Sequence, residues 1–150
     1  MSRILRKLTV ILCLTLVCAG LARAGAYEDM IEAIKRDDYA TVTGLIVRGV
    51  GVDTVDGQGN SLLTIAAREG SSHAVRTLLE AHARIDWANQ AGETALMHAA
   101  IQGHLEIVRL LLARGAKPGL ADRDGVTPLA HAQRRGYQEM ARLIRAAGGT

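Results

Sequence analysis

The sequence repeats itself with a period of 33 residues, and this feature constrains the fold more than any other. Aligned without gaps at that shift, residues 56–70 lie over residues 89–103 and over residues 122–136, and the apolar runs that follow them coincide as well. A repeat of this length is typical of a solenoid, in which each unit buries its apolar face only against its neighbours. The register predicts four units, which span residues 25–55, 56–88, 89–121 and 122–150.

The start of a helix is recognisable at the same place in three of the units. Thr94 and Thr127, with Ser61 as a third candidate, offer a side-chain oxygen that can cap the first backbone N–H groups of a helix. Pro128 follows Thr127 at the first helical position, where a missing N–H costs nothing. We therefore expect a first helix to begin directly after each of these residues.

Glycine recurs where the first helix should end, because a left-handed residue without a β-carbon is common there. The three glycines are Gly70, Gly103 and Gly136. A second, more apolar helix follows and ends at Gly115 in unit 3, whereas unit 2 has His82 at that position. Histidine adopts a left-handed backbone less readily than glycine, so His82 departs from the pattern.

These motifs resemble the ankyrin repeat. The run Gly125-Val126-Thr127-Pro128-Leu129 keeps the Gly-x-Thr-Pro-Leu pattern of that family, and residues 103–116 closely match its second helix. The resemblance implies an all-α ankyrin-repeat solenoid of helix-turn-helix units joined by protruding β-turn loops. Units 25–55 and 122–150 are expected to be capping repeats, because charged side chains crowd their helices.

Residues 1–24 have the pattern of a cleavable signal peptide, in which a positively charged segment precedes an apolar run. Residues 8–22 carry no charge, and Ala22-Arg23-Ala24 fits the small-x-small pattern of a cleavage site. Cleavage is expected after Ala24, with Ala26 as the second choice. A permanent membrane anchor is one alternative, although a spanning helix needs about 20 apolar residues. A lipoprotein signal that ends at Cys18 is the other alternative.

Cleavage after Ala24 would change the charge of the working protein. The whole chain has 18 basic and 15 acidic residues, but four basic residues and both cysteines precede the cleavage site, which leaves 14 − 15 = −1. The lack of cysteines and sequons in the mature chain favours the periplasm of a Gram-negative bacterium, with secretion as an alternative. The near-neutral charge and the scarcity of aromatic residues disfavour nucleic-acid binding.

Two histidines are the candidates for chemistry. His98 and His131 are 33 residues apart, so they should occupy equivalent places on adjacent first helices. Zinc needs three or four converging ligands, and Ile65 stands at the matching place in unit 2. Packing between helices is therefore the simpler interpretation, and no cofactor is expected. A metal- or ligand-dependent enzyme that uses His98 and His131 is the alternative function.

Asp56, Asn89 and Asp122 form a second ladder at the start of each loop. Their side chains could be mistaken for paired acid and base groups. At the beginning of a turn, however, Asp and Asn typically accept hydrogen bonds from the backbone two residues further on. We expect this structural role for all three.

The resemblance implies that a partner binds the turn tips and the concave face formed by the first helices. The tip candidates are Gln58, Asn60, Gln90, Glu93, Arg123 and Asp124. The helix candidates are Arg68, Glu69, Ile101, Gln102, Arg134 and Arg135. Trp87 stands in the loop before unit 3, where it is either a binding anchor, since Trp is frequent among hot spots, or a cover for the neighbouring hairpin.

The sequence thus predicts a non-enzymatic, exported ankyrin-repeat protein that binds another protein and is itself a monomer. Its contact with the membrane would occur only through the signal peptide before cleavage. Some bacterial periplasmic ankyrin proteins are associated with protection against peroxide. The resemblance therefore suggests a partner such as an exported enzyme that this protein stabilises or inhibits, or a role in stress protection.

Overall fold

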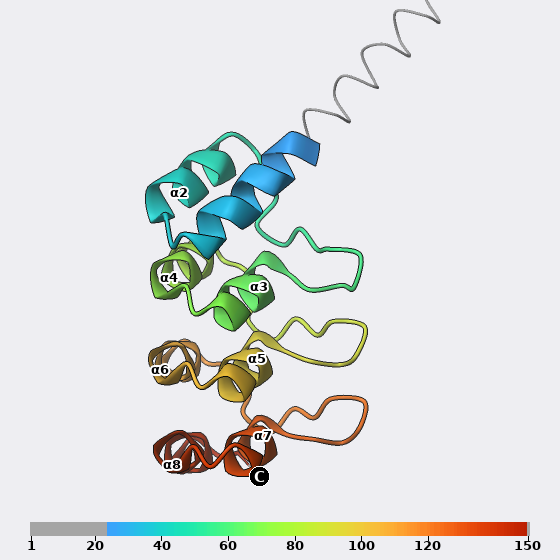
Figure 1. Ribbon diagram of the computed structural model, residues 1–150, viewed down its shortest axis with the longest axis vertical. Coiled ribbons are helices and arrows are strands. Elements are labelled where there is room, and N and C mark those ends of the chain that lie inside the picture. Colours follow the sequence, from blue (N-terminus) through green and yellow to red (C-terminus); the bar gives the residue numbers. More distant parts are fainter. Residues whose placement is uncertain (1–23, 150) are drawn as a thin grey trace, which may run out of the picture.

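A computed structural model describes residues 24–149, and these residues form a stack of helix pairs (Figure 1). The first pair consists of a helix over residues 24–35 and α2. The labelled helices are α2 (Tyr39–Val47), α3 (Leu62–Glu69), α4 (Ser72–Glu80), α5 (Ala95–Gln102), α6 (Leu105–Ala113), α7 (Pro128–Arg134) and α8 (Gln138–Ala146). The predicted helical solenoid is confirmed. The signal peptide predicted for residues 1–24 lies, apart from Ala24, outside the described residues.

The helices stack in two columns, and the loops project to one side (Figure 1). The first helices α3, α5 and α7 form the inner column beside the loops, and α4, α6 and α8 form the outer column. Each loop is a short hairpin, and the first one is closed by an antiparallel bridge between Val55 and Ser61. The inner helices and the hairpins lie along one side of the stack, which we call the concave side (Figure 1).

The predicted helix starts are confirmed by their hydrogen bonds. Ser61 Oγ accepts from the N–H of Thr64 at 3.1 Å, and Thr94 Oγ1 accepts from the N–H of Met97 at 3.4 Å. In unit 4, Thr127 caps α7 in the same way, and Pro128 is the first helical residue. Each bond satisfies one of the N–H groups that a helix leaves unpaired at its start.

The left-handed positions follow the repeat, with two departures. Gly115 has φ +87°, and His82, its counterpart in unit 2, adopts φ +63° as a non-glycine residue. Asp37 matches Gly70 in the 33-residue register and also has a positive φ, of 53°. The expectation that Gly136 directly ends its helix is wrong by one residue, because α7 ends at Arg134 and its C-cap residue Arg135 is still right-handed.

The core runs through the whole stack between the two columns. In α3, every residue from Leu62 to Ala67 is buried, and α4 contributes Val75 and Leu78 with no exposed surface. The same places in the next unit are filled by Leu96, Met97, Val108 and Leu111. Because each helix pair is covered by its neighbours, the stack holds the hairpins in a fixed row on one side.

Candidate functional site

The hairpin turns are built by the ladder of Asp56, Asn89 and Asp122. Asp56 Oδ1 accepts hydrogen bonds from the N–H groups of Gln58 and Asn60 at 2.8 and 2.9 Å. Asn89 Oδ1 and Asp122 Oδ1 repeat this pattern within their own turns. The predicted role of these residues in holding the turns is confirmed.

The turns are also bonded to one another. Gln90 donates its N–H to the carbonyl of Gln58 at 3.1 Å, and Arg123 donates its N–H to the carbonyl of Ala91 at 2.9 Å. The side chain of Gln90 adds a bond from Nε2 to the carbonyl of Gly57 at 3.2 Å. The three hairpin tips are therefore held in register by backbone bonds and do not depend on exposed side chains for their spacing.

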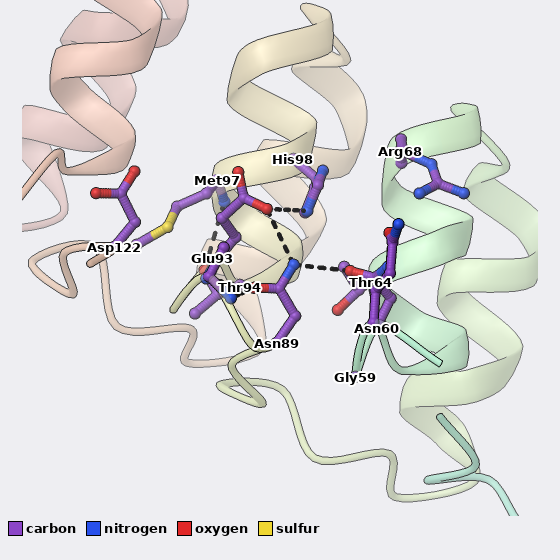
Figure 2. Close-up of polar contacts among 12 residues, drawn as sticks. Gly59, Asn60, Thr64, Arg68, Asn89, Glu93, Thr94, Met97, His98 and Asp122 are labelled. Atoms are coloured by element: carbon purple, nitrogen blue, oxygen red, sulfur yellow. Dashed lines mark hydrogen bonds and ion pairs between the residues drawn. The ribbon is translucent and has the colours of Figure 1, made fainter. Parts of the chain in front are cut away.

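A buried side-chain network supports the first two hairpins (Figure 2). Asn60 is 2% exposed, and its Nδ2 donates to Asp56 Oδ2 at 2.9 Å. Asn60 Oδ1 accepts from Asn89 Nδ2 at 2.8 Å. Asn89 Nδ2 also donates to Glu93 Oε2 at 2.9 Å. Asn60 was predicted to be a tip residue open to a partner, but its side chain is directed inward and joins two units.

His98 lies at the inner end of this network (Figure 2). Its side chain is 12% exposed, and its Nε2 is 3.2 Å from Glu93 Oε2, yet Nε2 has no aligned hydrogen-bond partner among the described residues. Burial lowers the pKa of His98 below the ordinary 6.5, a shift that nearby Arg68 reinforces and Glu93 opposes. Neutral imidazole is the form that this site favours.

His131 has a different environment from His98. Its Nε2 lies 3.1 Å from Asp122 Oδ2 in the same unit. Partial burial acts to raise the pKa of Asp122, but hydrogen bonds from Val126 and His131 hold it below its usual value. Each histidine therefore contacts an acid of its own unit, and residues 24–149 contain no group of three or more His, Cys, Asp or Glu side chains placed to hold a metal ion.

Trp87 contacts the hairpin at the start of its own unit, residues 56–88. Its Nε1 donates to the carbonyl of Gly59 at 2.8 Å, and the guanidinium of Arg84 lies 4.6 Å from the centre of its ring. The second interpretation of Trp87, as a cover for the neighbouring hairpin, is therefore the one that its contacts support. Its use as a binding anchor stays a prediction.

A groove between the three hairpin tips brings five of the predicted tip residues together. It encloses about 540 Å³. The predicted residues that line it are Gln58, Gln90, Glu93, Arg123 and Asp124. Four of them are exposed, whereas Glu93 is half-buried because it belongs to the network around Asn89.

The predicted helix residues form the second part of the concave surface. Arg68 and Glu69, at the end of α3, form an ion pair of 3.3 Å with each other. At the corresponding place Ile101 is half-buried and Gln102 is exposed, and in unit 4 two adjacent exposed arginines, Arg134 and Arg135, take their place. Within residues 24–149, the inner surface therefore changes from paired charge in unit 2 to positive charge without an ion pair in unit 4.

Two contacts between units were not predicted from the sequence. Asp37 Oδ2 lies 2.7 Å from His73 Nδ1, and its other oxygen accepts from the N–H of Ala74 at 2.9 Å. Ser71 Oγ donates to the carbonyl of Ile34 at 2.5 Å. The only available sign was that Asp37 stands in register with Gly70, a replacement that the period alone does not explain.

Comparison with protein families gives the class of this protein. The family model for ankyrin repeats, in three copies, matches residues 30–122 and residues 89–149. The chain therefore belongs to the ankyrin-repeat family, whose members are in general protein-binding scaffolds without catalytic activity. No curated protein matches the sequence. In the described part of the chain, no helix is both long enough and apolar enough to cross a membrane.

Proposed function

We propose that this protein binds a partner protein through the hairpin tips and inner helices of residues 56–135. The observation that carries the proposal is the groove between the three tips, whose walls are fixed by backbone hydrogen bonds from Gln90 to Gln58 and from Arg123 to Ala91. Four of the five predicted residues that line it are exposed and carry amides or charges. Gln58 and Gln90 each make one internal side-chain bond, and their other polar atoms, with Arg123 and Asp124, can bond to another chain.

The rigidity of this surface favours binding. Association loses free energy when loops and side chains become ordered, and a preformed surface avoids much of that loss. Here the turns are held by Asp56, Asn89 and Asp122, the three tips are joined by backbone bonds, and the Asn60–Asn89 bond adds a further link between the first two hairpins. The specificity of binding then comes from exposed side chains that do not hold the fold together, such as Gln102 and Arg134.

The proposal extends to the site of action. A charged segment, an apolar run and the Ala22-Arg23-Ala24 sequence support export, and the absence of cysteine after residue 24 suits a protein that needs no disulfide. We place the mature protein in a Gram-negative periplasm, where its partner would be an exported enzyme that it stabilises or inhibits. The mass of the protein recovered from cells tests this: loss of residues 1–24 supports export, and an intact N-terminus contradicts it.

Capture from a periplasmic extract tests the binding surface. A concave variant, Gln102→Ala with Arg134→Ala, removes two exposed inner side chains. A matched outer variant, Arg76→Ala with Glu106→Ala, removes two exposed side chains from α4 and α6. We expect the concave variant to lose a protein that the wild type and the outer variant both retain. Equal capture by all three proteins would contradict the proposed surface.

A further inference from the structure

A ring lies over a glycine at two successive unit boundaries. A β-carbon built on Gly70 would stand 2.7 Å from Cε1 of His104, and one built on Gly103 would stand 2.8 Å from Cζ of Tyr137. Real β-carbons essentially never approach other atoms so closely, so the ring occupies the space that the glycine leaves open. We call the space over such a glycine a ring seat.

A third ring seat, at Gly136, is open. Gly136 stands 33 residues after Gly103 and has φ +75°, but apart from its two chain neighbours no described residue has an atom within 4 Å of the place where its β-carbon would be. A groove of about 290 Å³ lies there instead. Its lining residues are Gln133, Gly136, Gln138, Ala141, Arg142 and Arg145.

The occupied seat at Gly103 shows which chemistry accompanies the ring. Tyr137 fills the seat, and Glu139, two residues later, forms an ion pair with Arg109 of the preceding unit. Arg142 is the equivalent of Arg109 in the 33-residue register. Among residues 24–149, no acidic side chain pairs with Arg142.

Two further residues distinguish the open seat from the occupied ones. Gln133 replaces Ala100, and Arg145 replaces Leu112, so the face is more polar and more positively charged than the boundaries inside the stack. Both side chains are exposed. A wholly apolar repeat would leave Arg142 and Arg145 without partners, whereas an acidic segment would supply them.

We propose that the Gly136 groove binds a segment of another protein in which an aromatic residue is followed two positions later by a carboxylate. The ring lies over Gly136, the carboxylate pairs with Arg142, and a further acidic group can reach Arg145. This face lies at the end of the stack formed by α7 and α8, apart from the concave groove. The proposal therefore does not depend on the function proposed above.

Titration with a peptide tests this site. The probe is a synthetic peptide with the sequence of residues 136–147, because this segment fills the occupied seat. NMR spectra of the isotope-labelled full chain should show shifts confined to Gln133, Gly136 and Arg142. Peptides in which the tyrosine becomes alanine or the glutamate becomes glutamine should bind about three- to tenfold more weakly, which is the scale of one exposed contact.

The protein variants separate the seat from other binding modes. Arg142→Glu should weaken binding by a similar factor, and Arg76→Glu, which changes the same position in unit 2, should not. A charge-swapped peptide, with arginine in place of the glutamate, should bind Arg142→Glu better than it binds the wild type. Equal binding of the alanine peptide would overturn the proposal. The proposal would also be overturned if the peptide shifted the NMR signal of Gly103 and if Arg109→Glu abolished that shift. The peptide would then be displacing α8 from its place in the stack.

Discussion

The imidazole of His104 lies over Gly70 of the preceding unit, and its Nε2 reaches the carbonyl of Arg68 at 3.1 Å. The contact joins the second helix of one unit to the end of the first helix of another. It makes glycine necessary at position 70 for two separate reasons, the left-handed backbone at φ +83° and the space that the ring takes. The two reasons can be separated by mutation.

Gly70→Ala should be more destabilising than Gly136→Ala. Both substitutions place a β-carbon on a left-handed residue, which costs about 1–2 kcal/mol. Only Gly70→Ala also displaces a ring, and overpacking of this kind adds about 1–3 kcal/mol. Urea unfolding of the two variants measures the difference. If the ring is the cause, adding His104→Ser to Gly70→Ala recovers most of the excess, and no recovery would show that the contact is unimportant.

The first unit boundary should tolerate a ring only after Asp37 is changed. Ser71 stands where His104 and Tyr137 stand in later units, and the residue in register with Gly70 at this boundary is Asp37, which has a β-carbon. Ser71→His should therefore destabilise the protein. In the double variant with Asp37→Gly the imidazole gains a seat, so a double-mutant cycle should give a favourable coupling of about 0.5–3 kcal/mol. A coupling near zero would mean that the glycine and the ring are independent.

Replacing Asn60 should weaken the link between the first two hairpins. Asn60→Val, which copies the residue of unit 4, removes the acceptor of Asn89 Nδ2 and the donor to Asp56. An unsatisfied buried polar group costs about 1–3 kcal/mol, and the free energy of unfolding should fall by that amount. Arg123→Ala, at an exposed position of the third hairpin tip, is the control and should change stability little. If Asn60→Val leaves the free energy of unfolding unchanged, the network has no structural role.

The free energy of unfolding should decrease as the pH falls below 6.5, because of His98. Its folded-state pKa is lowered by burial, so below pH 6.5 the unfolded chain binds a proton that the folded chain resists. The stability from neutral His98 is thus complete above pH 6.5 and is lost as the pH falls toward the lowered pKa. His98→Ile, which copies Ile65, should flatten the pH dependence of unfolding below pH 6.5 relative to wild type. If the pH dependence of unfolding is the same in His98→Ile and in the wild type, groups other than His98 cause the loss of stability in acid.

The period of 33 residues was enough to predict the solenoid, the caps at Ser61 and Thr94, and the turn role of Asp56. These features depend on residues a few positions apart, so local sequence determines them. The sequence did not reveal that the side chain of Asn60 is buried, because its counterparts Glu93 and Val126 gave no sign that it contacts a residue 29 positions away. Such a contact depends on how one unit stacks on the next.

The two departures from the repeat have different physical origins, one local and one that depends on stacking. His82 could be predicted to strain the left-handed position, since only its own backbone is involved. Asp37 could not be explained from its own position, because its carboxylate is satisfied by His73 and Ala74 of the following unit. Sequence alone therefore predicted a candidate surface in outline, and stacking decided which of its side chains are exposed.

The central claim, that the inner surface binds a protein, is tested most directly by hydrogen exchange of the full chain with and without its captured partner. The partner should slow exchange at the tips around Gln58, Gln90 and Arg123 and leave the outer helices α4 and α6 unchanged. Protection confined to the outer helices, with the tips exchanging at the same rate in both samples, would contradict the claim.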